Sequence, residues 1–278
     1  MGATHIVSTV GSLPQPPEQL TMSLGWERLY TGACLMAFLA MSANAFRLWR
    51  AQRDTIPLLL IAGGALCVFL EPMVDVLGLC WYPRGSSFEI FELLGRPIPF
   101  LVLPGYTFFM GGLTVIALHR LEVVGPKGLL QLYPVMILLE LPFEILAVRT
   151  EVYVYYGQQP LRIIDFPVWW LFVNTMVPVI AAVLLRAMRP WLVGPVALIV
   201  IPFLPAVDAG VNAALAWPTW TVLNSDVPTA VTQLAGLLTC GMAVGALVLL
   251  VRALEGRLGP AAAAGTTTPD SEREAALR

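Results

Sequence analysis

The chain has 278 residues, of which 58% are hydrophobic and only 12% are charged, and its mean hydropathy is +0.77. This composition excludes an ordinary soluble domain and indicates an integral membrane protein. A net charge of −2, without any cluster of basic and aromatic residues, also argues against nucleic acid as a partner.

Residues 1–25 contain no Lys or Arg and no apolar core, so we expect an extracytoplasmic N-terminal segment and not a cleaved signal peptide. Seven apolar windows of about 20 residues follow, the length that crosses about 30 Å of hydrocarbon. They are 26–46, 56–80, 98–119, 129–148, 166–185, 191–215 and 229–251. The sequence therefore predicts an all-α, polytopic membrane bundle of seven transmembrane helices over residues 26–253. Residues 254–278, whose end is rich in Ala, Thr and Glu, are predicted to be a disordered cytoplasmic tail.

The distribution of basic residues predicts the orientation, because positively charged loops stay in the cytoplasm. Eleven of the 16 basic residues would lie on one side: Arg47, Arg50, Arg53, Arg120, Lys127, Arg186, Arg189, Arg252, Arg257, Arg273 and Arg278. Only five would lie on the other: Arg28, Arg84, Arg96, Arg149 and Arg162. We therefore expect the N-terminus outside and the C-terminus in the cytoplasm.

Five carboxylates lie inside the apolar windows: Glu71, Asp75, Glu140, Glu144 and Asp208. A carboxylate in hydrocarbon costs several kcal/mol unless it is paired, wetted or protonated, so such residues usually face the interior of the bundle. In the expected orientation all five lie toward the outer side, and Asp226 is expected to start the seventh helix at the same level. The sequence predicts a polar cavity that opens toward the outer leaflet.

Four of these acids form two pairs, Glu71 with Asp75 and Glu140 with Glu144. The members of each pair are four residues apart and so share one face of their helix. Two like charges so close in an apolar medium are not expected to ionise together, which leaves a neutral carboxylic acid able to donate a proton. An alternative is that Asp75, Glu140 and Glu144 form structural ion pairs at the outer boundary. Their partners would then be Arg96, Arg149 or Arg162.

Aromatic residues gather at the same level, and we single out Trp81, Tyr106, Tyr156, Trp169, Trp170 and Trp220 as candidate substrate-binding residues. Most membrane proteins place such residues at the interface as an aromatic belt. The functional interpretation is that their ring faces stabilise a positive centre within about 6 Å. Asn174 is a further candidate ligand, although amides in membrane helices more often join two helices.

The sequence lacks the residues that several kinds of membrane protein and enzyme require. The only lysine, Lys127, lies in a predicted cytoplasmic loop and not in the last helix, where a retinal protein needs it. Cys34, Cys67, Cys80 and Cys240 form no C-x-x-C motif, and no H-E-x-x-H or Asp-rich magnesium motif occurs. We therefore expect no metal site and no cofactor, and an enzyme of this kind would begin its reaction by protonation.

A small chain of seven helices, with acids on the second helix and beside the seventh, resembles a known family. These are the membrane-bound terpene cyclases of fungal meroterpenoid and indole-diterpene pathways, with actinobacterial relatives that act on prenylated indoles. The matching positions are Glu71 in Phe-Leu-Glu-Pro-Met-Val-Asp and Asp226 in Leu-Asn-Ser-Asp-Val-Pro. The resemblance covers residues 26–251 and is one of architecture and acid placement; Asp75, Glu140 and Glu144 are not accounted for by it.

The resemblance implies that two acids start cyclisation by protonating a terminal epoxide or alkene of a hydrophobic isoprenoid. It also implies a bacterial cell membrane as the location, and a prenyltransferase and an epoxidase of the same pathway as partners. We expect Glu71 to be the leading proton donor, with Asp226 or Asp208 assisting. The alternative function is a seven-helix transporter or receptor whose acids carry protons or bind a cationic ligand.

Overall fold

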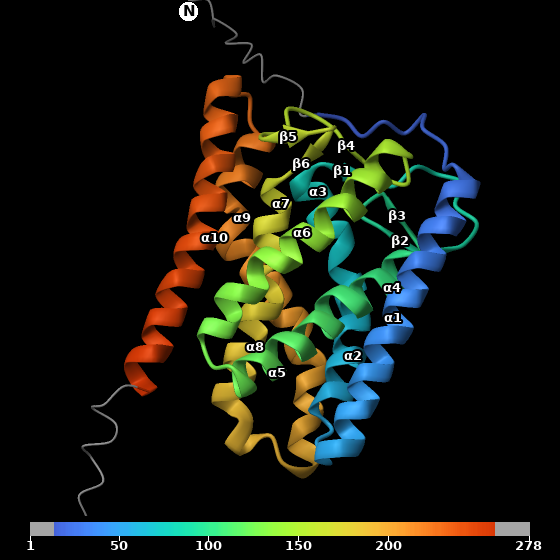
Figure 1. The fold of residues 1–278 in the computed structure, drawn as a ribbon. Helices are drawn as coiled ribbons and strands as arrows, with labels where there is room; N and C mark the ends of the chain where they lie inside the picture. The colour runs from blue at the N-terminus through green and yellow to red at the C-terminus, as the bar shows by residue number, and fades with distance from the viewer. Residues whose placement is uncertain (1–13, 259–278) are drawn as a thin grey trace, which may run out of the picture.

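The computed structural model describes residues 14–258 and is mostly helical (Figure 1). Seven helices in this range are long and apolar enough to cross a membrane, which confirms the predicted fold class. They run alternately up and down, so that the start of α1 and the end of α10 lie at opposite ends of the bundle (Figure 1).

The spans are built from the following elements. The first is α1 (Leu24–Gln52), and the second joins α2 (Ile56–Leu66), η1 (Cys67–Leu70) and α3 (Glu71–Gly78). The third joins α4 (Val102–Tyr106), η2 (Thr107–Gly112) and α5 (Leu113–Val123), and the fourth is α6 (Lys127–Arg149). The fifth joins α7 (Trp169–Asn174), α8 (Met176–Met188) and η3 (Arg189–Trp191). The sixth joins η4 (Gly194–Ile199) and α9 (Val200–Leu223), and the seventh is α10 (Thr229–Leu258).

Some helix ends differ from those predicted. The third span starts at Val102 and the fifth at Trp169, each a few residues late, because the residues before them form short strands. The sixth span continues to Leu223, well past the predicted residue 215. Helix α10 reaches Leu258; the rest of the predicted tail, and residues 1–13 of the N-terminal segment, lie outside the described residues.

Three antiparallel strand pairs lie at one end of the bundle, which we call the hairpin end (Figure 1). Strand β1 (Cys80–Trp81) pairs with β4 (Val154–Tyr155), and β2 (Glu89–Leu93) pairs with β3 (Arg96–Pro99). Strand β5 (Arg162–Ile163) pairs with β6 (Phe166–Pro167). The β1–β4 pair joins the loop after the second span to the loop after the fourth.

The second and third spans are both irregular in their middle. In the second, the α-helix changes to the 3₁₀ turn η1 shortly before Pro72. Pro72 has no N–H to donate to the preceding turn. In the third, η2 is a π-helical stretch, a feature that often occurs at functional sites. Glu71 follows η1 directly and Tyr106 precedes η2 directly, so both irregular turns flank residues of the site described below.

Glycines let these two spans touch backbone to backbone. A Cβ added at Gly64 of α2 would lie 2.7 Å from the backbone nitrogen of Gly111, and one added at Gly111 would lie 2.6 Å from the carbonyl oxygen of Leu60. Close approach through small residues is a common means of helix association in membranes, where lipid and side chains are equally apolar. These glycines therefore determine the spacing of α2 and η2.

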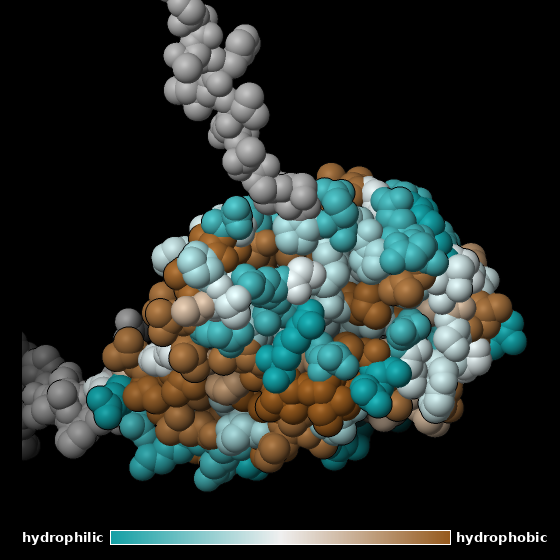
Figure 2. Space-filling view, turned by 90° about the horizontal axis from the view of Figure 1, so that it is seen from above, coloured by the Kyte–Doolittle hydropathy of each residue, from teal (hydrophilic) through white to brown (hydrophobic). Residues whose placement is uncertain are grey.

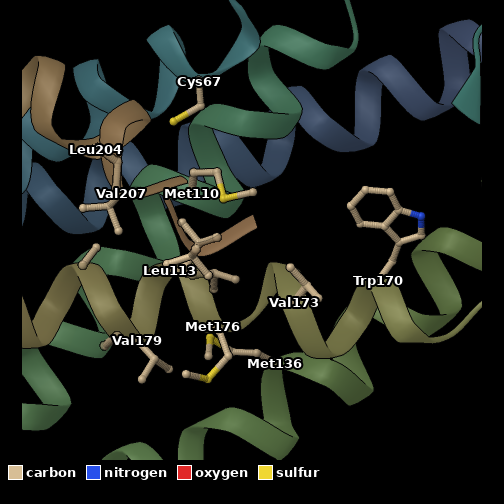
Figure 3. Packing of buried hydrophobic residues seen from close by; sticks show 14 of the residues in the cluster. Cys67, Met110, Leu113, Met136, Trp170, Val173, Met176, Val179, Leu204 and Val207 are labelled. Carbon is tan, nitrogen blue, oxygen red and sulfur yellow. The ribbon is translucent and has the colours of Figure 1, made fainter. Parts of the chain in front are cut away.

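A hydrophobic core fills the bundle below the hairpin end. Figure 3 shows its side chains from several spans, among them Met110, Leu113, Met136, Val179 and Leu204. Viewed from the hairpin end, the molecule carries many hydrophilic residues on this face, with hydrophobic residues between and beside them (Figure 2). This pattern fits a bundle whose ends meet water and whose sides meet lipid.

One buried acid connects the loop between β1 and β2 to the first helix. Glu27 of α1 is only 3% exposed and accepts hydrogen bonds from the backbone nitrogen of Ser87 at 2.9 and 3.1 Å and from the hydroxyl of Ser86. Because both of its carboxyl oxygens are hydrogen-bonded within this loop, Glu27 has a structural role and holds the loop against α1.

Candidate active site

A cavity of about 320 Å³ lies within the bundle near the hairpin end. Its volume is at the lower end of the range that small-molecule sites occupy. Four acids line it: Glu71, Asp75, Glu140 and Glu144. The two i,i+4 pairs predicted from the sequence therefore face one space, one pair from α3 and the other from α6.

Glu71 is held by two tyrosines. The hydroxyl of Tyr82 donates a hydrogen bond of 2.7 Å to Oε1, and the hydroxyl of Tyr106 donates to Oε2. All three residues line the cavity, and Glu71 is only 7% exposed. Two phenol donors orient the carboxyl group and would stabilise the carboxylate that remains after a proton is given to a substrate.

Asp75 lies one turn further along α3 and has an unsatisfied oxygen. Its Oδ2 is buried without a hydrogen-bond partner among the described residues. The basic residue that acts on it electrostatically is Arg96 of β3, which is buried and lies between the rings of Trp81 and Tyr156, 5.2 and 5.6 Å from their centroids. Arg96 donates its hydrogen bond of 2.6 Å to Tyr156 and does not approach Asp75 within 4 Å.

The second acid pair lies on α6. Oε1 of Glu140 accepts a hydrogen bond of 3.0 Å from Nδ2 of Asn174 on α7, while its Oε2 is buried without a partner among the described residues. Oε2 of Glu144 is also buried and unpartnered in that range. Pro142, between them, cannot donate to the carbonyl of Leu138. Both acids therefore carry a buried carboxyl oxygen without a protein partner among the described residues.

Two tyrosines of the β4 loop cover this second pair. Tyr153 and Tyr155 line the cavity, and their hydroxyl groups interact with Glu144. Burial raises the pKa of both tyrosines well above its ordinary value, and the nearby Glu144 carboxylate raises it further. Both phenols therefore stay neutral at physiological pH and can act as hydrogen-bond donors.

The remaining wall of the cavity is largely aromatic or apolar. Besides the tyrosines, Phe108, Phe109, Phe143 and Trp170 contribute rings. Trp170 stacks on Trp169, with centroids 4.1 Å apart, and Trp169 itself lies behind the wall. A cavity with several ring faces and few polar groups suits a ligand that is mainly apolar and becomes positive at one point.

The structure divides the predicted site residues into two groups. Glu71, Asp75, Glu140, Tyr106, Trp170 and Asn174 line the cavity, whereas Asp208, Asp226, Trp81, Tyr156, Trp169 and Trp220 do not. Asp208 is 1% exposed and accepts a hydrogen bond of 2.9 Å from Asn212 of the same helix. Asp226 is exposed in the loop between α9 and α10 and does not begin α10, which starts at Thr229.

Several lining residues were not among the predicted ones. Tyr30, Cys34, Ala37 and Met41 form a stripe along α1, at the i, i+4, i+7 and i+11 spacing that marks one helix face. This periodicity is visible in the sequence, with Tyr30 as its polar member. No such periodicity marks Tyr82, Tyr153 and Tyr155, because the pairing of β1 with β4 brings them over the cavity.

The alternative of structural ion pairs is not supported by the contacts of the described residues. Arg149 pairs with Asp165 at 3.9 Å, and Arg162 donates to the carbonyl oxygens of Tyr155 and Gly157. No ion pair within 4 Å involves an acid of the cavity in the range 14–258. In the same range, no group of three or more acidic, Cys or His residues is arranged to hold a metal ion.

No protein-family model, no curated protein and no solved structure matches this chain. Its own residues support the description of a mostly helical protein, with seven helices suited to span a membrane and an acid-lined cavity between them.

Proposed function

We propose that the protein is a membrane-bound terpene cyclase or isoprenoid isomerase that works without a metal. It would protonate an epoxide or alkene of a lipophilic prenylated substrate and guide the resulting carbocation to a ring. The observation that carries the proposal is that four carboxyl groups and many aromatic rings line one cavity within the apolar bundle. This proposal agrees with the resemblance to the membrane-bound terpene cyclases.

Glu71 is the proposed proton donor. In such a step the Glu71 O–H bond breaks, its proton forms a C–H bond at an alkene or an O–H bond at an epoxide, and the positive charge develops on the substrate. Tyr82 and Tyr106 would then hold the carboxylate through their hydroxyl groups. The ring faces of Tyr106, Phe108 and Trp170 would stabilise the cation while the chain folds.

Asp75, Glu140 and Glu144 supply the further acids of the cavity, and loss of a proton from the final cation to one of their carboxylates would complete the reaction. Asp208 and Asp226, which lie outside the cavity wall, have no contact with substrate in this proposal.

The second candidate is a receptor or transporter for a lipophilic cation. The unpartnered buried oxygens of Asp75, Glu140 and Glu144 favour it, because they could pair with a positive group. A transporter also needs a polar route to both membrane faces. Beyond the cavity, however, the core consists of packed apolar side chains such as Met176, Val179 and Leu204 (Figure 3). We therefore prefer the enzyme.

The test is the variant Glu71→Gln, which keeps the size of the side chain and removes the acidic proton. Membranes that contain the wild-type protein are assayed with prenylated indoles and prenylated phenols, each with and without a terminal epoxide. We expect cyclised products from wild type and a loss of at least 100-fold in Glu71→Gln, within the range that general acid catalysis supplies. Full turnover by the variant would exclude Glu71 as the donor, and wild-type binding without any product would favour the receptor.

A further inference from the structure

One residue that lines the cavity also belongs to the exposed, lipid-facing side of the bundle. Among the described residues that line the cavity, Leu139 of α6 is the one that is strongly exposed, at 67%. At the hairpin end, by contrast, most of the lining residues are buried: Tyr82 is 6%, Tyr153 5% and Leu101 3% exposed. Buried loop residues therefore lie on the water side of the cavity, and its exposed lining residue lies on the side of the bundle.

Near Leu139, neighbouring helices are not packed along each other. Helix α6 packs along α5, to which a short turn joins it, and along α10, but it forms no extended contact with α1 or η2. Side chains alone close the space between these three elements. The ring of Phe143 on α6 lies 4.4 Å from that of Tyr30 on α1 and 5.9 Å from that of Phe108 on η2, measured between centroids.

Leu139 is at the middle of its membrane span. Leu139 is twelve residues from Lys127 and ten from Arg149, the two ends of α6. At about 1.5 Å per residue these separations are roughly 18 and 15 Å. The hydrocarbon region is about 30 Å thick, so Leu139 lies near its centre.

We propose that the cavity receives its ligand sideways from the hydrocarbon region of the bilayer, through a portal formed by Leu139, Phe143 and Phe108. Only a molecule dissolved among the lipid chains is present at that depth, so the ligand is an elongated apolar molecule and not a water-soluble one. The ring of Phe143 must turn away from Tyr30 for a chain to pass. The inference rests on the proposed function in one respect, that the cavity is where the ligand acts.

The experiment compares two tryptophan variants of neighbouring residues in protein reconstituted into phosphatidylcholine liposomes. Leu139→Trp places a large ring at the portal. Leu138→Trp is the matched control, because Leu138 is equally exposed, at 68%, but does not line the cavity. The probe is geranylgeraniol that carries a benzophenone group, which is dissolved in the liposomes and activated by light. Labelled peptides are identified by mass spectrometry.

We expect the probe to label lining residues of α6 and η2 in wild type and in Leu138→Trp, and labelling to fall at least fivefold in Leu139→Trp. Phe143→Ala should increase the rate of labelling. Equal labelling in the two tryptophan variants, or labelling confined to the hairpin-end loops, would overturn the portal. Because labelling needs no turnover, the portal can be confirmed in a protein that fails the cyclase assay, and a working cyclase can fail the portal test.

Discussion

Tyr82 donates a hydrogen bond of 2.7 Å to Oε1 of Glu71, although Tyr82 lies outside the membrane span that contains the acid. The contact joins the irregular turn at Pro72 to the loop that follows β1. Together with Tyr106, which donates to the other oxygen, it fixes the orientation of the Glu71 carboxyl group toward the cavity.

Removing these hydroxyl groups should slow the reaction without removing the acid. We expect Tyr82→Phe and Tyr106→Phe each to lower kcat by about 10- to 100-fold, since a hydrogen bond to a charged group contributes roughly 1.5–3 kcal/mol. Steady-state rates of cyclised product measure this effect. Tyr133→Phe is the control, because Tyr133 donates to the carbonyl oxygen of Phe172 and does not line the cavity. An equal loss in the control would show a general effect of tyrosine removal.

Asn174 and Glu140 should act as one unit, because Nδ2 of Asn174 is the donor that holds Oε1 of Glu140. We expect Asn174→Leu and Glu140→Gln each to change the product ratio or the rate, and the double variant to be no worse than the more severe single one. A double-mutant cycle of kcat/KM measures the coupling, which should reach about 0.5–3 kcal/mol for residues in contact. Strictly additive effects would mean that Asn174 acts on the substrate by itself.

The seven spans were predictable because length and apolar composition alone identify membrane helices. The position of Glu71, Asp75 and Glu140 on one cavity was predictable for a related reason, since acids in an apolar helix avoid lipid and residues four apart share a face. For both conclusions, the properties of individual helices were enough.

The other lining residues could not be predicted, because their positions depend on contacts between segments that are distant in the sequence. The pairing of Cys80–Trp81 with Val154–Tyr155 brings Tyr153 and Tyr155 over Glu144, and nothing in either short segment predicts its partner. The aromatic residues of these loops also resemble an interfacial belt, in which the sequence does not distinguish one ring from another. Trp81 and Tyr156 were therefore chosen as candidates. The cavity is instead lined by Tyr82, Tyr153 and Tyr155. Asp226 was chosen by resemblance, and the structure places it in the loop before α10, outside the cavity wall.

Gly64→Ala should destabilise the protein although alanine favours helices. The new Cβ would lie 2.7 and 2.8 Å from backbone atoms of Gly111, so α2 and η2 would have to separate. Overpacking of this kind costs roughly 1–3 kcal/mol. The control is Gly245→Ala in α10, where nothing lies within 4 Å of the added carbon, and it should stabilise the helix by up to about 1 kcal/mol. Thermal unfolding in detergent measures both, and a stabilised Gly64→Ala would contradict the close contact.

The buried tyrosines predict a loss of stability at alkaline pH. Because the pKa of Tyr153 and Tyr155 is raised above the ordinary value of 10.0, the folded protein keeps protons that the unfolded chain releases. Stability is therefore fully present below about pH 10 and falls as the pH rises further toward the raised values. The Tm measured between pH 8 and pH 11 should fall less steeply above pH 10 in the Tyr153→Phe/Tyr155→Phe variant than in wild type. Identical slopes would mean that other groups control alkaline unfolding.

The orientation predicted from the basic residues can be tested by cysteine labelling. After Cys34, Cys67, Cys80 and Cys240 are replaced, single cysteines are introduced at Ser87, Gln158 and Gln52, all exposed positions. Ser87 and Gln158 lie at the hairpin end, and Gln52 lies at the opposite end of α1. Because the loops around Gln52 carry most of the basic residues, a membrane-impermeant maleimide applied to intact cells should label the first two and not the third. The reversed pattern would place the hairpin end in the cytoplasm. The portal at Leu139 would be unaffected, since it lies near the middle of the bilayer in either orientation.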